Sequence, residues 1–131
     1  MISCIDVERK FRNKEVLKAI NFQIEEPKIT ALVGHKGAGK STLMRLLAGR
    51  LKPASGEVLI ENMKPFQHLG IAMNTVLIEE NMLFSDSLTL NEHFKWAKSF
   101  YPNWQQEIAK SLCDYASLDM NAYYDKLSKG Q

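Results

Sequence analysis

The sequence predicts an α/β protein with a small antiparallel β unit near its N-terminus. Three observations lead to this fold class. Two β-prone runs, 2–8 and 16–24, flank a short polar segment and are typical of a hairpin. A mostly apolar run of strand length, 29–33, leads through a glycine-rich loop into a helical pattern. Helical patterns also close the chain, and the 131 residues are enough for one domain.

The first half of the chain alternates strand and helix patterns. The segment 12–14 is expected to form the hairpin tip, and the apolar run 29–33 is expected to be a strand buried on both faces of a parallel sheet. After the loop, apolar residues recur at helical spacing and predict a helix of about three turns, which ends near Gly49 and Pro53. Those residues are Leu43, Leu46, Leu47 and Leu51. Further strands are predicted at 57–61 and 71–78.

Two helices are predicted in the second half of the chain. Thr89 is followed three residues later by Glu92, the pattern of a capping box that opens a helix. The second helix starts after Pro102, and its apolar residues lie on one stripe. The stripe consists of Trp104, Ile108, Leu112 and Tyr115.

Composition indicates a soluble globular protein, with 45% hydrophobic and 24% charged residues. The formal net charge of +2 and the lack of a basic cluster argue against nucleic acid as a partner. The longest apolar runs are far shorter than the roughly 20 residues that span a bilayer. Cys4 and Cys113 have no metal-ligand spacing, and reduced thiols in the cytosol are expected.

The strongest motif is Gly-x-x-x-x-Gly-Lys-Ser, between the predicted strand 29–33 and the following helix. In this context the backbone N–H groups of the loop and the helix N-terminus surround a phosphate. Lys40 is expected to reach the β- and γ-phosphates of ATP, and the Ser41 hydroxyl to bind Mg²⁺. The predicted nucleotide contacts are Gly34, His35, Lys36, Gly37, Ala38, Gly39, Lys40, Ser41 and Thr42.

Beyond this motif, the chain resembles the ATP-binding subunits of ABC transporters. The similar stretches are 29–51, 52–58, 83–84 and 88–92, together with 127–131, which is similar to the signature Leu-Ser-Gly-Gly-Gln. The resemblance implies that Phe11 stacks on adenine. It also implies that the signature residues contact ATP bound by a second ATP-binding subunit in a head-to-tail dimer. These residues are Leu127, Ser128, Lys129, Gly130 and Gln131.

The resemblance implies a P-loop NTPase fold of the ABC ATPase type and a division of the single domain 1–131. An N-terminal antiparallel β subdomain would comprise 1–28 and 56–61, and a partial parallel core sheet would comprise 29–55 and 71–78. A helical subdomain would comprise 85–131. The implied partners are ATP with Mg²⁺ and a transmembrane permease subunit. The permease would hold the chain at the cytoplasmic face of the membrane.

The sequence departs from the family pattern at several places. Glu79 occupies the position of the Q-loop glutamine, where a carboxylate could still reach Mg²⁺ or the attacking water, and Lys129 replaces the first signature glycine. Family members continue with a strand that ends in Asp-Glu and with a switch histidine. His35, His68 and His93 all precede the signature. We therefore expect an N-terminal portion of the domain, which binds ATP but does not hydrolyse it alone.

Other interpretations remain open at this point. The run 75–80 ends in two acids and could supply the metal ligand of a small P-loop kinase. The chain could also be a nucleotide-binding module without enzymatic activity. Glu79 could be a solvated loop acid, and Phe11 could be a core residue. The segment 82–84 could contact a membrane subunit or be buried within the domain.

Overall fold

The computed structural model describes residues 1–79 and 84–128. The chain divides into two compact units, Met1–Ile78 and Glu79–Gln131, and each is described by itself.

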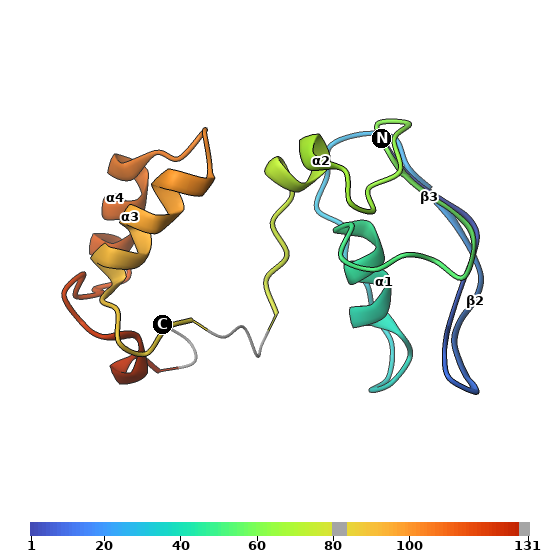
Figure 1. Ribbon diagram of the computed structural model, residues 1–131, viewed down its shortest axis with the longest axis horizontal. Coiled ribbons are helices and arrows are strands. Elements are labelled where there is room, and N and C mark those ends of the chain that lie inside the picture. The colour runs from blue at the N-terminus through green and yellow to red at the C-terminus, as the bar shows by residue number, and fades with distance from the viewer. Residues whose placement is uncertain (80–83, 129–131) are drawn as a thin grey trace. The chain divides into compact units, whose positions relative to one another are not determined.

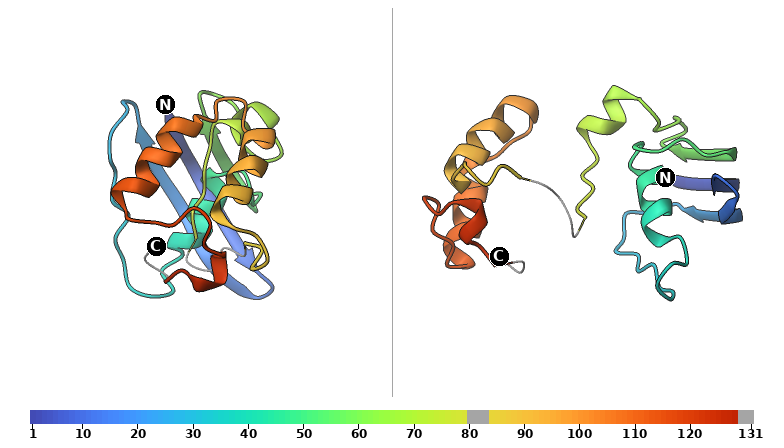
Figure 2. Two further views of the ribbon diagram at one scale, coloured as in Figure 1. Left: turned by 90° about the vertical axis from the view of Figure 1, so that its left-hand side faces the viewer. Right: turned by 60° about the horizontal axis from the view of Figure 1, so that its bottom comes forward.

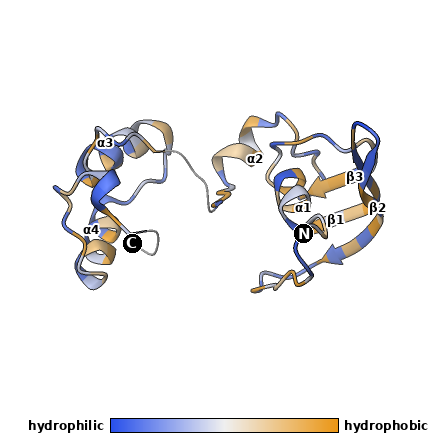
Figure 3. Ribbon diagram, turned by 90° about the horizontal axis from the view of Figure 1, so that it is seen from below, coloured by the Kyte–Doolittle hydropathy of each residue, from blue (hydrophilic) through white to orange (hydrophobic). Residues whose placement is uncertain are grey.

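A three-stranded antiparallel sheet forms the base of the first unit (Figures 1 and 2). Its strands are β1 (Ile2–Phe11), β2 (Lys14–Ile24) and β3 (Ser55–Ile60), in the order β2-β1-β3. The predicted hairpin is confirmed: Phe11 pairs with Lys14 around a two-residue turn. Polar and apolar residues alternate along β2 (Figure 3). Ala19 (φ 44°) lies between Leu17 and Ile20 and shifts the alternation, so that both of these residues reach the core.

The core of the first unit lies between this sheet and α1 (Lys40–Leu47). Its buried residues are Cys4, Val7, Leu17, Leu43, Leu46 and Val58. Cys4 is a buried free cysteine, and burial raises the pKa of its thiol to about 11. The helix α1 is shorter than the predicted three turns. It ends in a Schellman motif in which Gly49 (φ 69°) donates to the Leu46 carbonyl and Arg50 donates to the Arg45 carbonyl.

Two predicted core strands do not form. Residues 29–33 have no regular structure, and their apolar side chains are exposed: Ile29 fully and Val33 to 86%. The start of the predicted strand 71–78 belongs instead to the short helix α2 (Leu69–Met73). Beyond this helix, Val76 and Ile78 are exposed, whereas Leu77 between them is buried. A strand needs a hydrogen-bonding neighbour, and the sheet of the described residues is entirely antiparallel. The predicted parallel core sheet is therefore not formed by this part of the chain.

The second unit contains α3 (Leu90–Phe100), α4 (Gln106–Tyr115) and the 3₁₀ helix η1 (Tyr124–Lys126). The predicted capping box is present: Glu92 N–H donates to the Thr89 hydroxyl, and the Glu92 carboxylate accepts from Thr89 N–H at 2.8 Å. Trp104 lies before α4, and its ring packs on Phe94. Along the predicted stripe, Ile108, Leu112 and Tyr115 are exposed, and Cys113 is the buried residue of α4.

We predict that Thr89→Ala destabilises the second unit by about 1 kcal/mol, because it removes the side-chain cap of α3. Hydrogen bonds from the Thr89 backbone and hydroxyl lower the pKa of Glu92. The capping contribution should therefore be complete above the ordinary pKa of glutamate and decline as acid protonates Glu92. Thermal unfolding followed by circular dichroism at several pH values measures both effects.

Ser99→Ala is the matched control, because the Ser99 hydroxyl only donates to the Lys95 carbonyl within the same helix. It should leave unfolding nearly unchanged. An equal loss of stability in the two variants would contradict the capping role of Thr89.

Candidate nucleotide-binding site

The glycine-rich loop 34–39 leads directly into the N-terminus of α1. Gly37 (φ 88°) and Gly39 (φ 91°) adopt left-handed backbone conformations that favour glycine. The first intrahelical hydrogen bond runs from Leu43 N–H to the Gly39 carbonyl. The N–H groups of residues 40–42 therefore have no carbonyl to bond within the helix. No acid lies in the first turn to neutralise the positive helix end, so this terminus suits an anion.

The Lys40 side chain folds back across the loop. Its ammonium group donates to the Gly34 carbonyl at 2.6 Å and to the His35 carbonyl at 2.8 Å. These contacts hold a cation beside the backbone amides of the helix N-terminus. An ammonium group has three N–H donors, and phosphate oxygens are stronger acceptors than neutral carbonyls. Loop and side chain together therefore present the charge and the donors that a polyphosphate requires.

The hairpin fixes the position of the loop through Gly39. This glycine is buried against β2, and a Cβ atom placed on it would lie 2.7 Å from Leu17 Cδ2 and 2.9 Å from the Val16 carbonyl oxygen. Only a residue without a side chain allows this approach. The end of the hairpin and the phosphate loop consequently lie side by side, although the sequence separates them by more than a dozen residues.

Phe11 ends β1 at the same end of the hairpin and is 44% exposed. The ring is therefore available to a ligand, unlike the ring of a buried core residue. The Arg9 guanidinium lies 4.7 Å from the centre of the Phe11 ring, and Arg9 Nη1 donates to the Lys52 carbonyl at 3.0 Å. Sequence reasoning missed Arg9. The alternation of residues along β1, which places Arg9 on the same face as Phe11, could have indicated it.

The other predicted contacts of the loop differ in exposure. His35, Lys36, Ala38 and Ser41 are exposed, whereas Thr42 is half-buried. His35 Nδ1 lies 2.9 Å from the Lys36 carbonyl oxygen, so this ring is held by the loop itself. Ser41 lies in the first turn of α1, one residue after Lys40.

The remaining predicted site residues belong to the second unit. Glu79 is half-buried, and its proposed role at the metal stays a prediction. Leu127 and Ser128 follow η1, and Leu127 N–H donates to the Tyr124 carbonyl at 3.1 Å. The other signature residues, Lys129, Gly130 and Gln131, lie outside the described residues, as do Met82 and Leu83 of the predicted docking segment 82–84.

The segment that leads to Ser128 is attached to the start of α3. Tyr124 N–H donates to the Leu88 carbonyl, and Leu90 N–H donates to the Ala122 carbonyl, both at 3.2 Å. The ring of Tyr124 also lies 5.0 Å from that of Phe84 and 6.0 Å from that of His93, centre to centre. Backbone and ring contacts thus fix the approach to the signature within the second unit.

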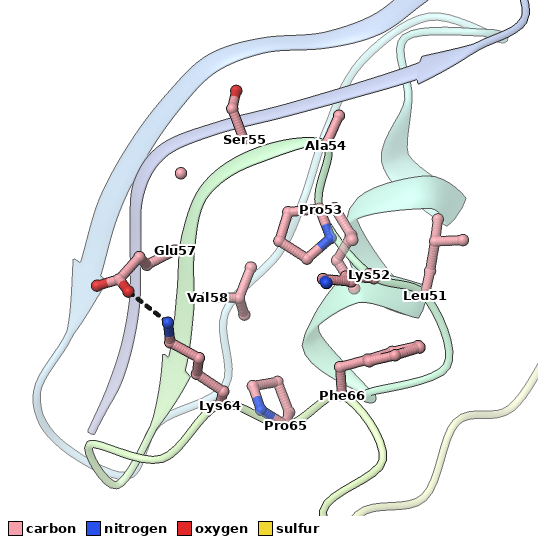
Figure 4. Close-up of a pocket in the computed structure, with 12 residues that line it drawn as sticks. Leu51, Lys52, Pro53, Ala54, Ser55, Glu57, Val58, Lys64, Pro65 and Phe66 are labelled. Carbon is pink, nitrogen blue, oxygen red and sulfur yellow. Dashed lines mark ion pairs between the residues drawn. The ribbon is translucent and has the colours of Figure 1, made fainter.

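A cavity of about 250 Å³ occurs elsewhere in the first unit (Figure 4). It is lined by the end of α1, by β3 and by Pro65 and Phe66, and the Lys64–Glu57 ion pair lies at its edge. The phosphate loop precedes the opposite, N-terminal end of α1, so this cavity is not the phosphate site. In the described part of the chain, no three His, Cys, Asp or Glu side chains gather as a metal site, and no helix is long and apolar enough to cross a membrane.

Solved structures identify the fold. An ATP-binding subunit of an ABC transporter superposes with a TM-score of 0.83 at 24% identity, covering 98% of this chain and 56% of that one. A dimeric ATP-binding cassette, in a post-hydrolysis state with ADP and Pi, superposes with a TM-score of 0.75 at 24% identity. The match covers 100% of this chain and 65% of that one. The fold is therefore that of a P-loop NTPase of the ABC ATPase type, as predicted.

Sequence comparison identifies the family. The family model for the ABC transporter matches residues 17–131, and the chain belongs to this family. It is 32% identical over 98 residues to the SkfA peptide export ATP-binding protein SkfE of Bacillus subtilis, covering 74% of this chain and 41% of that protein. It is 30% identical over 132 residues to the spermidine/putrescine import ATP-binding protein PotA of Aster yellows witches'-broom phytoplasma. This match covers 82% of this chain and 32% of that protein. The chain thus spans less than half the length of either relative.

We predict that Gly39→Ala disturbs the contact between hairpin and loop. The new Cβ atom would overlap Leu17 and the Val16 carbonyl in a conformation that disfavours side chains, and it should destabilise the first unit by more than about 1 kcal/mol. Gly34→Ala is the matched control, because its Cβ atom would meet only Ala38 Cβ at 3.3 Å and the flexible Lys40 side chain. Urea unfolding compares the two variants; similar midpoints would show that Gly39 is not tightly packed.

Proposed function

We propose that the chain binds Mg²⁺-ATP and serves as the nucleotide-binding module of an ABC transporter. The observation that carries this proposal is the position of the Lys40 ammonium group, held across the loop by the Gly34 and His35 carbonyls at the N-terminus of α1. Family membership supports the same ligand, since the relatives are named as ATP-binding proteins of import and export systems.

The proposed phosphate contacts follow from the donors of the loop. Backbone N–H groups at the start of α1 would bind phosphate oxygens, and the Lys40 ammonium would exchange loop carbonyls for the β- and γ-phosphates. Glycines at 37 and 39 let the backbone approach these oxygens closely. The exposed Ser41 would complete the site, with its hydroxyl as a ligand of Mg²⁺.

The base would stack on Phe11. The half-exposed ring lies at the end of the hairpin that packs against the loop through Gly39, which suits a ligand that joins a base to a polyphosphate. Stacking on an aromatic face tolerates any base, so we expect only a mild preference for ATP over GTP.

In the whole protein, we propose that a permease subunit and a second, head-to-tail ATP-binding subunit complete the machinery at the cytoplasmic membrane face. A dimeric cassette among the structural neighbours supports the second subunit. The signature residues 127–131 would contact the ATP of that subunit.

Hydrolysis requires a group that positions the attacking water. The family resemblance assigns this role to an Asp-Glu pair and a switch histidine, which match no residues of the given sequence, so we propose that the 131-residue chain alone binds ATP without steady turnover.

We predict that Lys40→Ala lowers the affinity for Mg²⁺-ATP at least tenfold while the thermal unfolding midpoint changes little. The variant loses the cation for the β- and γ-phosphates, and Lys40 is only half-buried. Titration with a fluorescent ATP analogue measures affinity, with the exposed Lys18→Ala as the control for a general loss of charge. Equal affinities of parent and Lys40→Ala would overturn the phosphate assignment.

In a phosphate-release assay, turnover by the parent above that of Lys40→Ala would contradict the proposed lack of hydrolysis.

We predict that Phe11→Ala lowers ATP affinity roughly ten- to a hundredfold, because the base loses its stacking partner. Phe11→Trp should retain most of the affinity, since it preserves an aromatic face. Calorimetric titration of both variants with ATP tests this, alongside thermal unfolding. A Phe11→Ala variant that unfolds without a selective loss of binding would assign the ring to packing.

A further inference from the structure

Arg9 and Phe11 form a stacked pair at the end of β1. The two residues are separated by Lys10, so strand alternation places them on one face of the sheet. The Arg9 guanidinium lies 4.7 Å from the centre of the ring, within the range of a cation–π interaction. Lys10 forms an ion pair with Glu15 at 3.2 Å and does not take part in the stack.

The guanidinium is held in place from a second side. Arg9 Nη1 donates to the Lys52 carbonyl, in the segment that follows α1. The Nε atom is buried and has no hydrogen-bond partner among the described residues. One carbonyl and one aromatic face therefore fix the group, and a planar guanidinium suits both contacts better than a lysine ammonium.

This arrangement leaves one ring face to Arg9 while Phe11 as a whole keeps 44% of its surface exposed. A free phenylalanine side chain would have to be ordered when a base stacks on it. A ring already held by a cation loses less conformational freedom on binding. A base that stacks on the other face of the ring would not need to contact the cation.

We propose that Arg9 is a positioning residue for the base of the bound nucleoside triphosphate: it holds the Phe11 ring so that its free face receives the base. This inference rests on the proposed function, because it assumes that Phe11 stacks on the base. Arg9 then affects the base and not the phosphates, which Lys40 and the helix N-terminus contact.

The test is a double-mutant cycle on the full chain, with two ligands measured by calorimetry. Arg9→Met keeps a long side chain but removes the charge, and it is combined with Phe11→Ala. The ligands are Mg²⁺-ATP and Mg²⁺-tripolyphosphate, which has no base. Lys10→Met is the matched control, since it removes the same charge from the neighbouring residue of the same strand. Arg9→Lys tests rescue by a conservative cation.

Arg9→Met should lower ATP affinity two- to fivefold, as expected for a partly exposed cation–π contact, and leave tripolyphosphate affinity unchanged. Lys10→Met should change neither affinity, and Arg9→Lys should recover part of the loss. In the Phe11→Ala background, Arg9→Met should have no further effect.

Three results would overturn the proposal: an equal loss for both ligands, an undiminished loss in the Phe11→Ala background, or no loss for ATP. The first result would mean that Arg9 stabilises the fold or attracts both ligands by its charge alone. Thermal unfolding distinguishes these two roles. If the parent binds tripolyphosphate but Phe11→Ala does not change ATP affinity, the proposed stacking of the base on Phe11 and this inference are both wrong. The proposed phosphate contacts of the loop would still stand. A parent that binds neither ligand would reject the proposed function itself.

Discussion

The approach of Gly39 to β2 is the contact on which the candidate site depends. A side chain at this position would overlap Leu17 and the Val16 carbonyl, so the absence of a Cβ atom sets the distance between hairpin and loop. Leu17 is at the same time a core residue. The packing of the first unit and the position of its phosphate loop are therefore coupled through a single strand. A change in the core of the hairpin is expected to move the loop as well.

The helix α1 packs against the sheet through one face and presents its N-terminus at the candidate site. Leu43 and Leu46 bury one face against the sheet, which anchors the helix. Its N-terminus carries unpaired backbone N–H groups and a lysine, whereas its C-terminus is closed by the Schellman motif around Gly49. The end that lacks internal partners is the one that we propose to bind the phosphates. Because apolar residues anchor the helix by one face, its N-terminal N–H groups do not have to pack within the protein.

Exposed apolar segments are the main departure from the predicted architecture. The runs 29–33 and 71–78 have the composition of buried parallel strands, yet Ile29, Val33, Val76 and Ile78 are exposed. Apolar composition shows that a segment could be buried as a strand, but the segment forms a strand only if another strand pairs with it. The three antiparallel strands of the first unit offer hydrogen-bonding partners to one another and to neither of these runs. The exposed stripe of α4 has the same origin, since amphipathic spacing does not supply the opposing surface.

The sequence by itself determined the features that depend on local geometry. The hairpin, the glycine loop before α1, the stop at Gly49 and the capping box of Thr89 with Glu92 were all predictable. Each follows from backbone preferences, from turn residues or from contacts between residues close in the chain. Only the tertiary structure brought β2 against Gly39 and Arg9 against the segment after α1. It alone decided which apolar runs became strands, because sheet pairing and burial join residues that are distant in sequence, and no local pattern encodes that distance.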